Sequence, residues 1–325
     1  MVNVNQVSRL VILGTGGTIA GRANRANDNV GYEAGQVSVD DLVAMVPALA
    51  EGPLDVEQVV QLNSKDMVLG VWQKLAARVA AHLDREEVSG IVITHGTDTI
   101  EETAFVLQTV LRPSKPVVLA CAMRPATALV PDGPQNLSDA AAVARHPQAQ
   151  GVVVVCAGQI HGARDVAKVH PYRTDPFDSG DAGALGCVEE AQLRLFRPWP
   201  QAVNQGSHDA AGLKRLLEAS TLPRVELMYS HADSDGELVR ALLGHNPDSA
   251  VGLRGLVVAG TGNGTVHESL QVALEKAQAQ GVEVVVASRC ARGRVVPHAA
   301  QPFQDSGGLS PVKARLAMAL RLLET

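Results

Sequence analysis

The chain carries the sequence VILGTGGTIAG at residues 11–21, and this stretch decides the fold. An apolar run that begins at Leu10 stops at Gly14, which predicts a buried parallel strand followed by a glycine-rich turn. Open α/β sheets bind ligands at the carboxyl edge of their strands, where such a turn would lie. The glycines let a ligand approach the main chain, and Thr15 and Thr18 supply hydroxyls that can attack it or hydrogen-bond to it.

Other interpretations of this turn compete with a catalytic one. A dinucleotide-binding turn needs the pattern G-x-G-x-x-G, and counting from Gly14 and Gly16 places Ile19 where the third glycine belongs. A phosphate-binding P-loop fits less well, because no G-K-[ST] follows. A structural turn with incidental threonines stays open on this stretch alone, so a second stretch has to decide.

That second stretch has the sequence GIVITHGTDTIEE at residues 90–102. Its apolar run predicts a buried strand that ends at Thr94, and Thr99-x-x-Glu102 predicts a capping box for the helix that follows. Capping leaves the segment His95–Asp98 unexplained. This segment precedes a helix N-terminus, whose partial positive charge and free N–H groups favour an anionic ligand.

Length, charge and cysteine usage narrow the class of protein. The 325 residues predict about two domains, each large enough for its own core, and a net charge of -6 argues against a nucleic-acid or membrane-surface partner. No apolar run approaches the roughly 20 residues of a membrane span, and the N-terminal residues lack an export signal, so we expect a cytoplasmic protein. No cysteine pair or His/Cys cluster has metal-binding spacing, so we expect no metal site and buried structural thiols at Cys121, Cys156, Cys187 and Cys290.

Polar residues also follow the first turn and the next expected strand. Residues 22–36 are rich in glycine and asparagine and contain Tyr32 as their only aromatic residue, so we expect a lid loop. The phenol of Tyr32 is either a surface group or is carried into the site on closure. The strand Gln58–Leu62 leads into a polar cluster with Ser64 and Lys65, which lies on the same sheet edge as the first turn if the strands are parallel; its alternative role is to cap the next helix.

The rest of the chain continues the alternation of strands and helices. A polar segment after the apolar run 151–156 contains Lys168, for which a solvated surface charge is the alternative to a functional role. Proline-rich residues then precede a second strand-helix series. We therefore predict an α/β protein with a larger, mostly parallel-sheet domain that carries the catalytic turns at residues 1–197. A linker at 198–222 leads to a smaller parallel α/β domain of flavodoxin-like type at 223–325.

The two turns together resemble the bacterial-type L-asparaginases. The signature segments of that family are a T-G-G-T-[IV]-[AGS] turn and an H-G-T-D-T turn, and both are intact here, at residues 15–20 and 95–99. The likeness extends over essentially the whole chain, and further matching segments lie at residues 122–125, 132–136, 162–168 and 262–264.

The resemblance implies an amidohydrolase that converts L-asparagine to L-aspartate and ammonia, with minor L-glutaminase activity and without a metal or organic cofactor. By motif, Thr18 is the nucleophile that forms an acyl-enzyme, and Tyr32 is the lid residue that assists it. Thr97, Asp98 and Lys168 match the second catalytic triad of the family. A threonine hydroxyl needs a neighbour that accepts its proton, and either a deprotonated lysine or the tyrosine can do so, which leaves the route of the proton open.

The resemblance also implies substrate contacts and an oligomer. Ser64, Lys65, Thr97 and Asp98 stand at substrate-binding positions, and Asn263 matches a residue that reaches the active site of a neighbouring subunit in a homotetramer built as a dimer of dimers. Two departures weaken the inference on substrate choice. Lys65 stands where many relatives have glutamine, and residues 289–304 hold arginines where an acidic residue of the neighbouring chain is expected.

Two further functions remain open from the sequence. One is a glutaminase-type subunit that supplies ammonia to an amidotransferase; such subunits carry an extra N-terminal domain, whereas the first strand here starts by Leu10. The other is a non-catalytic amino-acid sensor or nucleotide-binding protein, which would tolerate the loss of Thr18.

Overall fold

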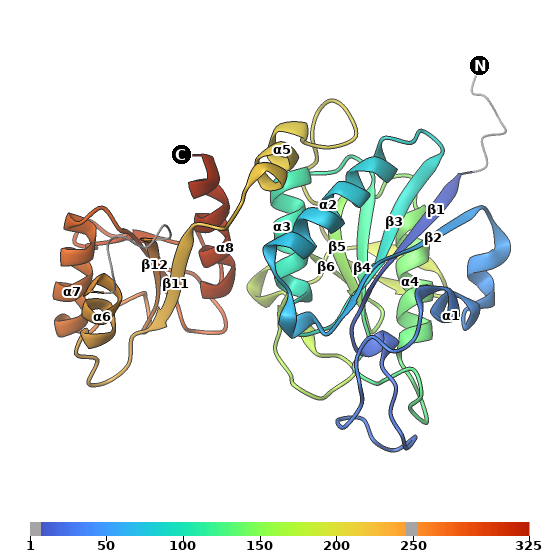
Figure 1. Cartoon of the computed structure of the whole chain (residues 1–325), viewed down its shortest axis with the longest axis horizontal. Coiled ribbons are helices and arrows are strands. Elements are labelled where there is room, and N and C mark those ends of the chain that lie inside the picture. Colours follow the sequence, from blue (N-terminus) through green and yellow to red (C-terminus); the bar gives the residue numbers. More distant parts are fainter. Residues whose placement is uncertain (1–7, 245–251, 325) are drawn as a thin grey trace. The chain divides into compact units, whose positions relative to one another are not determined.

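An eight-stranded mixed sheet forms the first part of the chain in the computed structural model, which describes residues 8–244 and 252–324 (Figure 1). The order of the strands is β10-β9-β6-β5-β4-β3-β1-β2. The parallel strands are β1 (Arg9–Gly16), β2 (Leu54–Leu62), β3 (Val88–Thr94), β4 (Pro116–Ala120) and β5 (Gly151–Cys156), and the antiparallel ones are β6 (Gln159–Gly162), β9 (Gly186–Glu189) and β10 (Gln192–Leu195).

Helices cover both faces of this sheet, which explains why its central strands are almost continuously apolar. On one face, α1 (Val39–Ala44) and α4 (Gly133–Arg145) pack on a cluster that includes Leu10 and Ile12 of β1. Helices α2 (Leu69–Leu83) and α3 (Ile100–Leu111) lie together on the other face (Figure 1). Because side chains alternate along a strand, consecutive apolar residues of β1 serve both layers.

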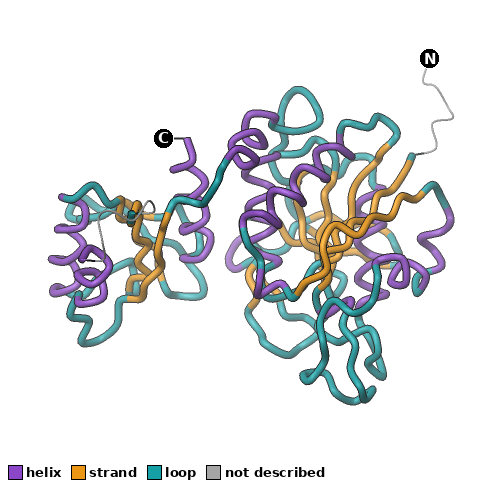
Figure 2. Tube along the Cα trace, viewed as in Figure 1, coloured by secondary structure: helices purple, strands orange, loops and turns teal. Residues whose placement is uncertain are grey.

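Loops gather at the carboxyl edge of the parallel strands (Figure 2). The register places Gly16 of β1 beside Leu62, the last residue of β2, and Gly14 beside Thr94, the last residue of β3, so the turns after these strands leave the sheet close together. A short antiparallel hairpin of β7 (Ala167–Lys168) and β8 (Phe177–Asp178) lies outside the main sheet.

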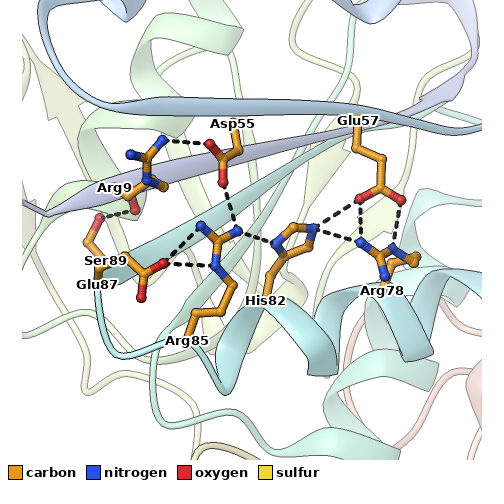
Figure 3. A network of polar contacts seen from close by, with 8 residues as sticks. All are labelled: Arg9, Asp55, Glu57, Arg78, His82, Arg85, Glu87 and Ser89. Atoms are coloured by element: carbon orange, nitrogen blue, oxygen red, sulfur yellow. Dashed lines mark hydrogen bonds and ion pairs between the residues drawn. The ribbon is translucent and has the colours of Figure 1, made fainter.

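A network of charged side chains joins α2 to β2 near the amino ends of the first strands (Figure 3). Arg78 donates two hydrogen bonds to Glu57, at 2.7 and 2.8 Å, and holds the pKa of that carboxyl below its usual range. His82 accepts a hydrogen bond from Arg85 at Nδ1, so its Nε2 donates to Glu57 at 3.0 Å, and Arg85 also pairs with Asp55. These residues lie away from the carboxyl edge and stabilise the packing of helix on strand.

The second unit begins at Glu218, after the first unit ends at Leu217 within α5 (Ala210–Glu218). Its sheet has four parallel strands in the order β11-β12-β13-β14, with one apolar cluster for α6 and α7 and a separate one for α8. The bounds are β11 (Arg224–Tyr229), α6 (Glu237–Gly244), β12 (Leu253–Gly260), α7 (Glu268–Ala279), β13 (Glu283–Ser288), β14 (Gln304–Asp305) and α8 (Pro311–Arg321).

The predicted fold class is confirmed, with several local differences. The first strand continues to Gly16, and β2 begins at Leu54, four residues before the predicted start at Gln58. Strands β6, β9 and β10 were not predicted, because each is only four residues long and has no long apolar run. The thiols Cys121 and Cys156 are buried as expected, but Cys187 is half-buried and Cys290 is exposed. In the described part of the chain, no helix has both the length and the apolar character needed to cross a bilayer.

Candidate active site

The turns after β1 and β3 touch each other through their backbones. A side-chain carbon added to Gly17 would lie 2.3 Å from Cα of Gly96, so only glycine permits this approach. Gly17 also has a positive φ of 81°, which glycine adopts without strain, and its N–H donates to the carbonyl of Leu62 at the end of β2. The three strand ends therefore meet at one point, and Thr18 and Thr97 follow directly on the two glycines.

Thr18 begins a short 3₁₀ helix (Thr18–Ala20) and is buried. Its Oγ1 lies 2.6 Å from Oη of Tyr32, and either oxygen can donate in this hydrogen bond. Tyr32 belongs to the loop at residues 22–36, whose base is closed by a reciprocal pair of backbone hydrogen bonds between Arg22 and Glu33. We expected the phenol of Tyr32 either at the surface or in the site. It lies in the site, where it is hydrogen-bonded to the candidate nucleophile Thr18.

Lys168 forms the centre of a second polar cluster. Its ammonium donates to Oγ1 of Thr97 at 2.9 Å and to Oδ1 of Asp98 at 2.7 Å. The Lys168 side chain is only 17% exposed, so it is not a solvated surface charge. Its backbone N–H donates to Glu101 in the first turn of α3 at 3.3 Å, which fixes β7 to the same helix that follows Asp98.

Ser64 faces the junction of the two turns, whereas Lys65 extends into solvent. Ser64 is 2% exposed, and a side-chain carbon added to Gly96 would lie 2.5 Å from its Oγ. The ammonium of Lys65 pairs with the adjacent Asp66 at 3.0 Å, and the Lys65 side chain is 64% exposed. Neither Ser64 nor Asp66 caps α2, because the N-cap residue is Val68 and no side chain bonds to that helix end.

The predicted capping box at Thr99 and Glu102 is wrong. Thr99 is the N-cap residue of α3, but its side chain makes no capping hydrogen bond. Its hydroxyl donates instead to the carbonyl of Ser64 at 2.7 Å, across 35 positions of sequence. The T-x-x-E pattern considers only hydrogen bonds within the helix end itself. In the folded protein, the turn after β2 brings the carbonyl of Ser64 to the Thr99 hydroxyl as a different acceptor.

His95 positions the peptide that leads into Thr97, a role that the sequence left unexplained. The imidazole is fully buried, and burial lowers the pKa of His95 to about 4, so the ring is neutral at physiological pH. Nδ1 lies 2.8 Å from the carbonyl of Gly96 and must carry the proton, because a carbonyl only accepts. The described chain has no cis peptide bond, so the N–H of Thr97 points away from His95.

The buried cysteine Cys121 is chemically unsuited to replace a threonine nucleophile. A hydrogen bond with Cys156 and, to a smaller extent, burial raise the pKa of the Cys121 thiol well above its ordinary value. A thiol held in its protonated form is a poor nucleophile. Within residues 8–244 and 252–324, no group of three or more His, Cys, Asp or Glu side chains is arranged to hold a metal ion.

Asn263 lies in the second unit, in the turn between β12 and α7. Its Nδ2 donates to the carbonyl of Val296 at 2.9 Å, and its Oδ1 accepts from the N–H of Val296 at 2.8 Å. The amide therefore fastens this turn to the arginine-containing segment 289–298 of the same unit.

Two family models match almost the whole chain. The model "Asparaginase, N-terminal" matches residues 9–201, and the model "Glutaminase/Asparaginase C-terminal domain" matches residues 224–325. The chain belongs to the asparaginase family. Family membership supports a hydrolase of the asparaginase type.

Several named relatives match the chain over nearly its whole length. A protein of Haemophilus influenzae named "Probable L-asparaginase periplasmic" is 36% identical over all of this chain and 91% of its own length. L-asparaginase 2 of Escherichia coli is 35% identical over 97% of this chain and 89% of its own length. A glutaminase-asparaginase of Pseudomonas fluorescens biotype A is 36% identical over 98% and 88%.

A solved asparaginase also matches the fold. The crystal structure of a protein described as a probable cytoplasmic L-asparaginase from Campylobacter jejuni superposes with a TM-score of 0.86 at 36% identity. The match covers 98% of this chain and 96% of that one.

The structure brings most of the site residues predicted from the sequence together, and it adds two groups that the sequence did not single out. Thr18, Tyr32, Thr97, Asp98 and Lys168 fall into the two hydrogen-bonded clusters just described, and Ser64 lies against the turn that separates them. The missed groups are the hydroxyl of Thr99 and the imidazole of His95. The only sequence signal for either was its place inside the H-G-T-D-T segment.

Proposed function

We propose that the protein is an L-asparagine amidohydrolase that releases L-aspartate and ammonia through an acyl-enzyme on Thr18, with minor activity on L-glutamine. One observation carries the proposal: the hydroxyl of Thr18, hydrogen-bonded to Tyr32 at 2.6 Å, stands on a turn in backbone contact with the turn that bears Thr97. Two hydroxyls, each with its own polar partner, therefore flank one small volume at the sheet edge.

In the first half of the proposed reaction, Oγ1 of Thr18 attacks the side-chain amide carbon of asparagine. A threonine hydroxyl must lose its proton as the new C–O bond forms, and the Tyr32 oxygen is the group in contact that can accept or relay it. The C–N bond then breaks, and ammonia leaves with that proton. The N–H of Thr97, which points away from His95, is suited to stabilise the oxyanion, a role typically worth ~10²–10³ in rate.

In the second half, water hydrolyses the ester on Thr18 and regenerates the hydroxyl. Because the Lys168 ammonium donates to Oγ1 of Thr97, the hydroxyl of Thr97 retains its own proton for a contact with water or substrate. Asp98 offers a carboxylate to the α-ammonium of the substrate, and Ser64 offers a hydroxyl to the α-carboxylate. Glutamine is one methylene longer, a difference worth only ~1–3 kcal/mol in a pocket, so some glutaminase activity is expected.

The proposal includes an assembly in which Asn263 completes the site of a neighbouring subunit, with a dimer of dimers as the full particle. It also includes a cytoplasmic location. The named relatives differ on location, since one is called periplasmic and another cytoplasmic.

The test is a coupled ammonia assay on the purified protein with L-asparagine and L-glutamine, together with the variant Thr18→Ala. We expect kcat/KM to be higher for asparagine, and Thr18→Ala to lower kcat by at least about a thousandfold, as removal of a nucleophile typically does. Calorimetry should still detect binding of L-aspartate to the variant. Retention of most of the wild-type rate by Thr18→Ala would place the nucleophile elsewhere.

A further inference from the structure

We propose that Thr99 is a positioning residue that holds Ser64 in its substrate-binding place, an inference that rests on the proposed function. Thr99 does not touch the reacting atoms. Its hydroxyl joins the turn after β3 to the turn after β2 by a hydrogen bond of 2.7 Å to the carbonyl of Ser64.

The hydroxyl of Thr99 serves this cross-link instead of its own helix. An N-cap Ser or Thr typically stabilises a helix by about 1 kcal/mol through a bond to the N–H of the second or third helical residue. Thr99 occupies the N-cap position of α3 without making that bond. A departure from the local rule that gains a bond to a distant loop is characteristic of functional sites.

Ser64 has little room to move, so the bond on its carbonyl controls its side chain. Ser64 is 2% exposed, and its Oγ lies close enough to Gly96 that an added carbon there would be 2.5 Å away. The same carbonyl also accepts the N–H of Met67 at 3.2 Å, which closes the short turn. With the Thr99 bond removed, the Ser64 carbonyl would keep only the hydrogen bond from Met67 in its own turn, and the Ser64 hydroxyl would be held less firmly in its place beside Gly96.

The consequence is a specific kinetic signature. Ser64 is assigned to binding the α-carboxylate, which is bound equally in the substrate and in the transition state. Loss of such an interaction raises KM and leaves kcat largely unchanged. A general disturbance of α3 would instead move Thr97 and Asp98 and lower kcat.

The experiment compares Thr99→Val, which removes the hydroxyl and keeps the shape, with Thr99→Ser, which keeps the hydroxyl. Thr109→Val is the matched control, because Thr109 lies on the same helix and its hydroxyl also bonds a carbonyl at 2.8 Å, that of Phe105 one turn back. We expect Thr99→Val to raise KM for L-asparagine about tenfold with kcat within threefold of wild type. Thr99→Ser and Thr109→Val should stay within about twofold in both constants.

Affinity for L-aspartate, measured by calorimetry on the same four proteins, separates this inference from the proposed function. Thr99→Val should weaken aspartate binding by the same factor as it raises KM. An unchanged KM and aspartate affinity in Thr99→Val, a failure of Thr99→Ser to restore them, or an equal loss in Thr109→Val would each overturn the role of Thr99. If the wild-type protein binds aspartate but releases no ammonia from asparagine, the proposed function fails, and the aspartate affinities alone decide on Thr99.

Discussion

The neutral imidazole of His95 fixes the orientation of the peptide bond between Gly96 and Thr97, in the turn after β3. His95 is fully buried, and its Nδ1–H holds the carbonyl of Gly96. Protonation would place a charge in the interior with no carboxylate beside it, which is why burial lowers its pKa to about 4. Folding therefore depends on the neutral form of this side chain.

Stability should consequently depend on pH through His95. Between its ordinary pKa of 6.5 and the folded value of about 4, the unfolded chain binds a proton at His95 that the folded protein does not bind. The free energy of unfolding therefore falls as pH decreases through this window, by about 3 kcal/mol from this residue. Denaturant unfolding at steps between pH 7.5 and 4 should show a shallower decline in His95→Asn, whose amide can still donate to Gly96. Parallel curves for the two proteins would contradict the assignment.

The contrast between Thr97 and Thr99 marks how far a sequence predicts a site at the level of single residues. Thr97, Asp98 and Lys168 were predicted from motifs. The structure places Nζ of Lys168 at 2.9 Å from Oγ1 of Thr97 and at 2.7 Å from Oδ1 of Asp98. The role of Thr99 was mispredicted, because a local pattern cannot state which distant carbonyl will come within reach. The acceptor on Ser64 becomes available only when the ends of β2 and β3 are placed on either side of β1.

At the level of elements, the loop at residues 22–36 is fastened by a neighbouring loop. Oγ1 of Thr127 accepts the N–H of Ala23 at 2.8 Å and donates to the carbonyl of Ala23 at 3.4 Å. A third bond runs from the N–H of Leu129 to the carbonyl of Ala26. These contacts hold the loop in the position that places Tyr32 on Thr18.

Removal of the Thr127 hydroxyl should therefore open the loop more often. We expect Thr127→Val to lower kcat/KM for asparagine about fivefold, because the form with Tyr32 in place becomes less populated. Hydrogen exchange of the amides at residues 22–36 should be faster in the unliganded variant than in the wild type, and L-aspartate should reduce the difference. Thr127→Ser is the control that keeps both bonds. Equal exchange rates in Thr127→Val and wild type would show that the position of the loop does not depend on the Thr127 hydroxyl.

Among the strands of the first sheet, some were predictable from the sequence and others were not. The central strands β1, β3 and β4 were found because burial on both faces makes them continuously apolar. Strands β6, β9 and β10 are each only four residues long, and β9 and β10 have exposed residues among buried ones. Their pairing depends on antiparallel contacts of β6 with β5, of β9 with β6 and of β10 with β9, which no short sequence window contains.

At the level of the whole molecule, the groups assigned to one reaction lie in two separate units of the chain. Thr18 and Lys168 lie within the part matched by the N-terminal family model, and Asn263 lies within the part matched by the C-terminal one. Both polar atoms of the Asn263 amide are used on the backbone of Val296. In the proposed assembly, we expect Asn263 to act by holding the turn at residues 261–265 in place, and this turn would face the site of a neighbouring subunit.

Complementation between two impaired variants tests this assembly. Thr18→Ala should be inactive, and Asn263→Ala should lose about tenfold or more in kcat/KM because the two hydrogen bonds that hold the turn to Val296 disappear. If Asn263 serves the neighbouring site, a co-expressed 1:1 mixture assembles some dimers in which one site combines the intact Thr18 of one chain with the intact Asn263 of the other. Random pairing makes such sites about a quarter of the total, so the mixture should regain about a quarter of wild-type activity. If Asn263 serves its own chain, the mixture shows only the average of the two variants, measured separately at the same protein concentration.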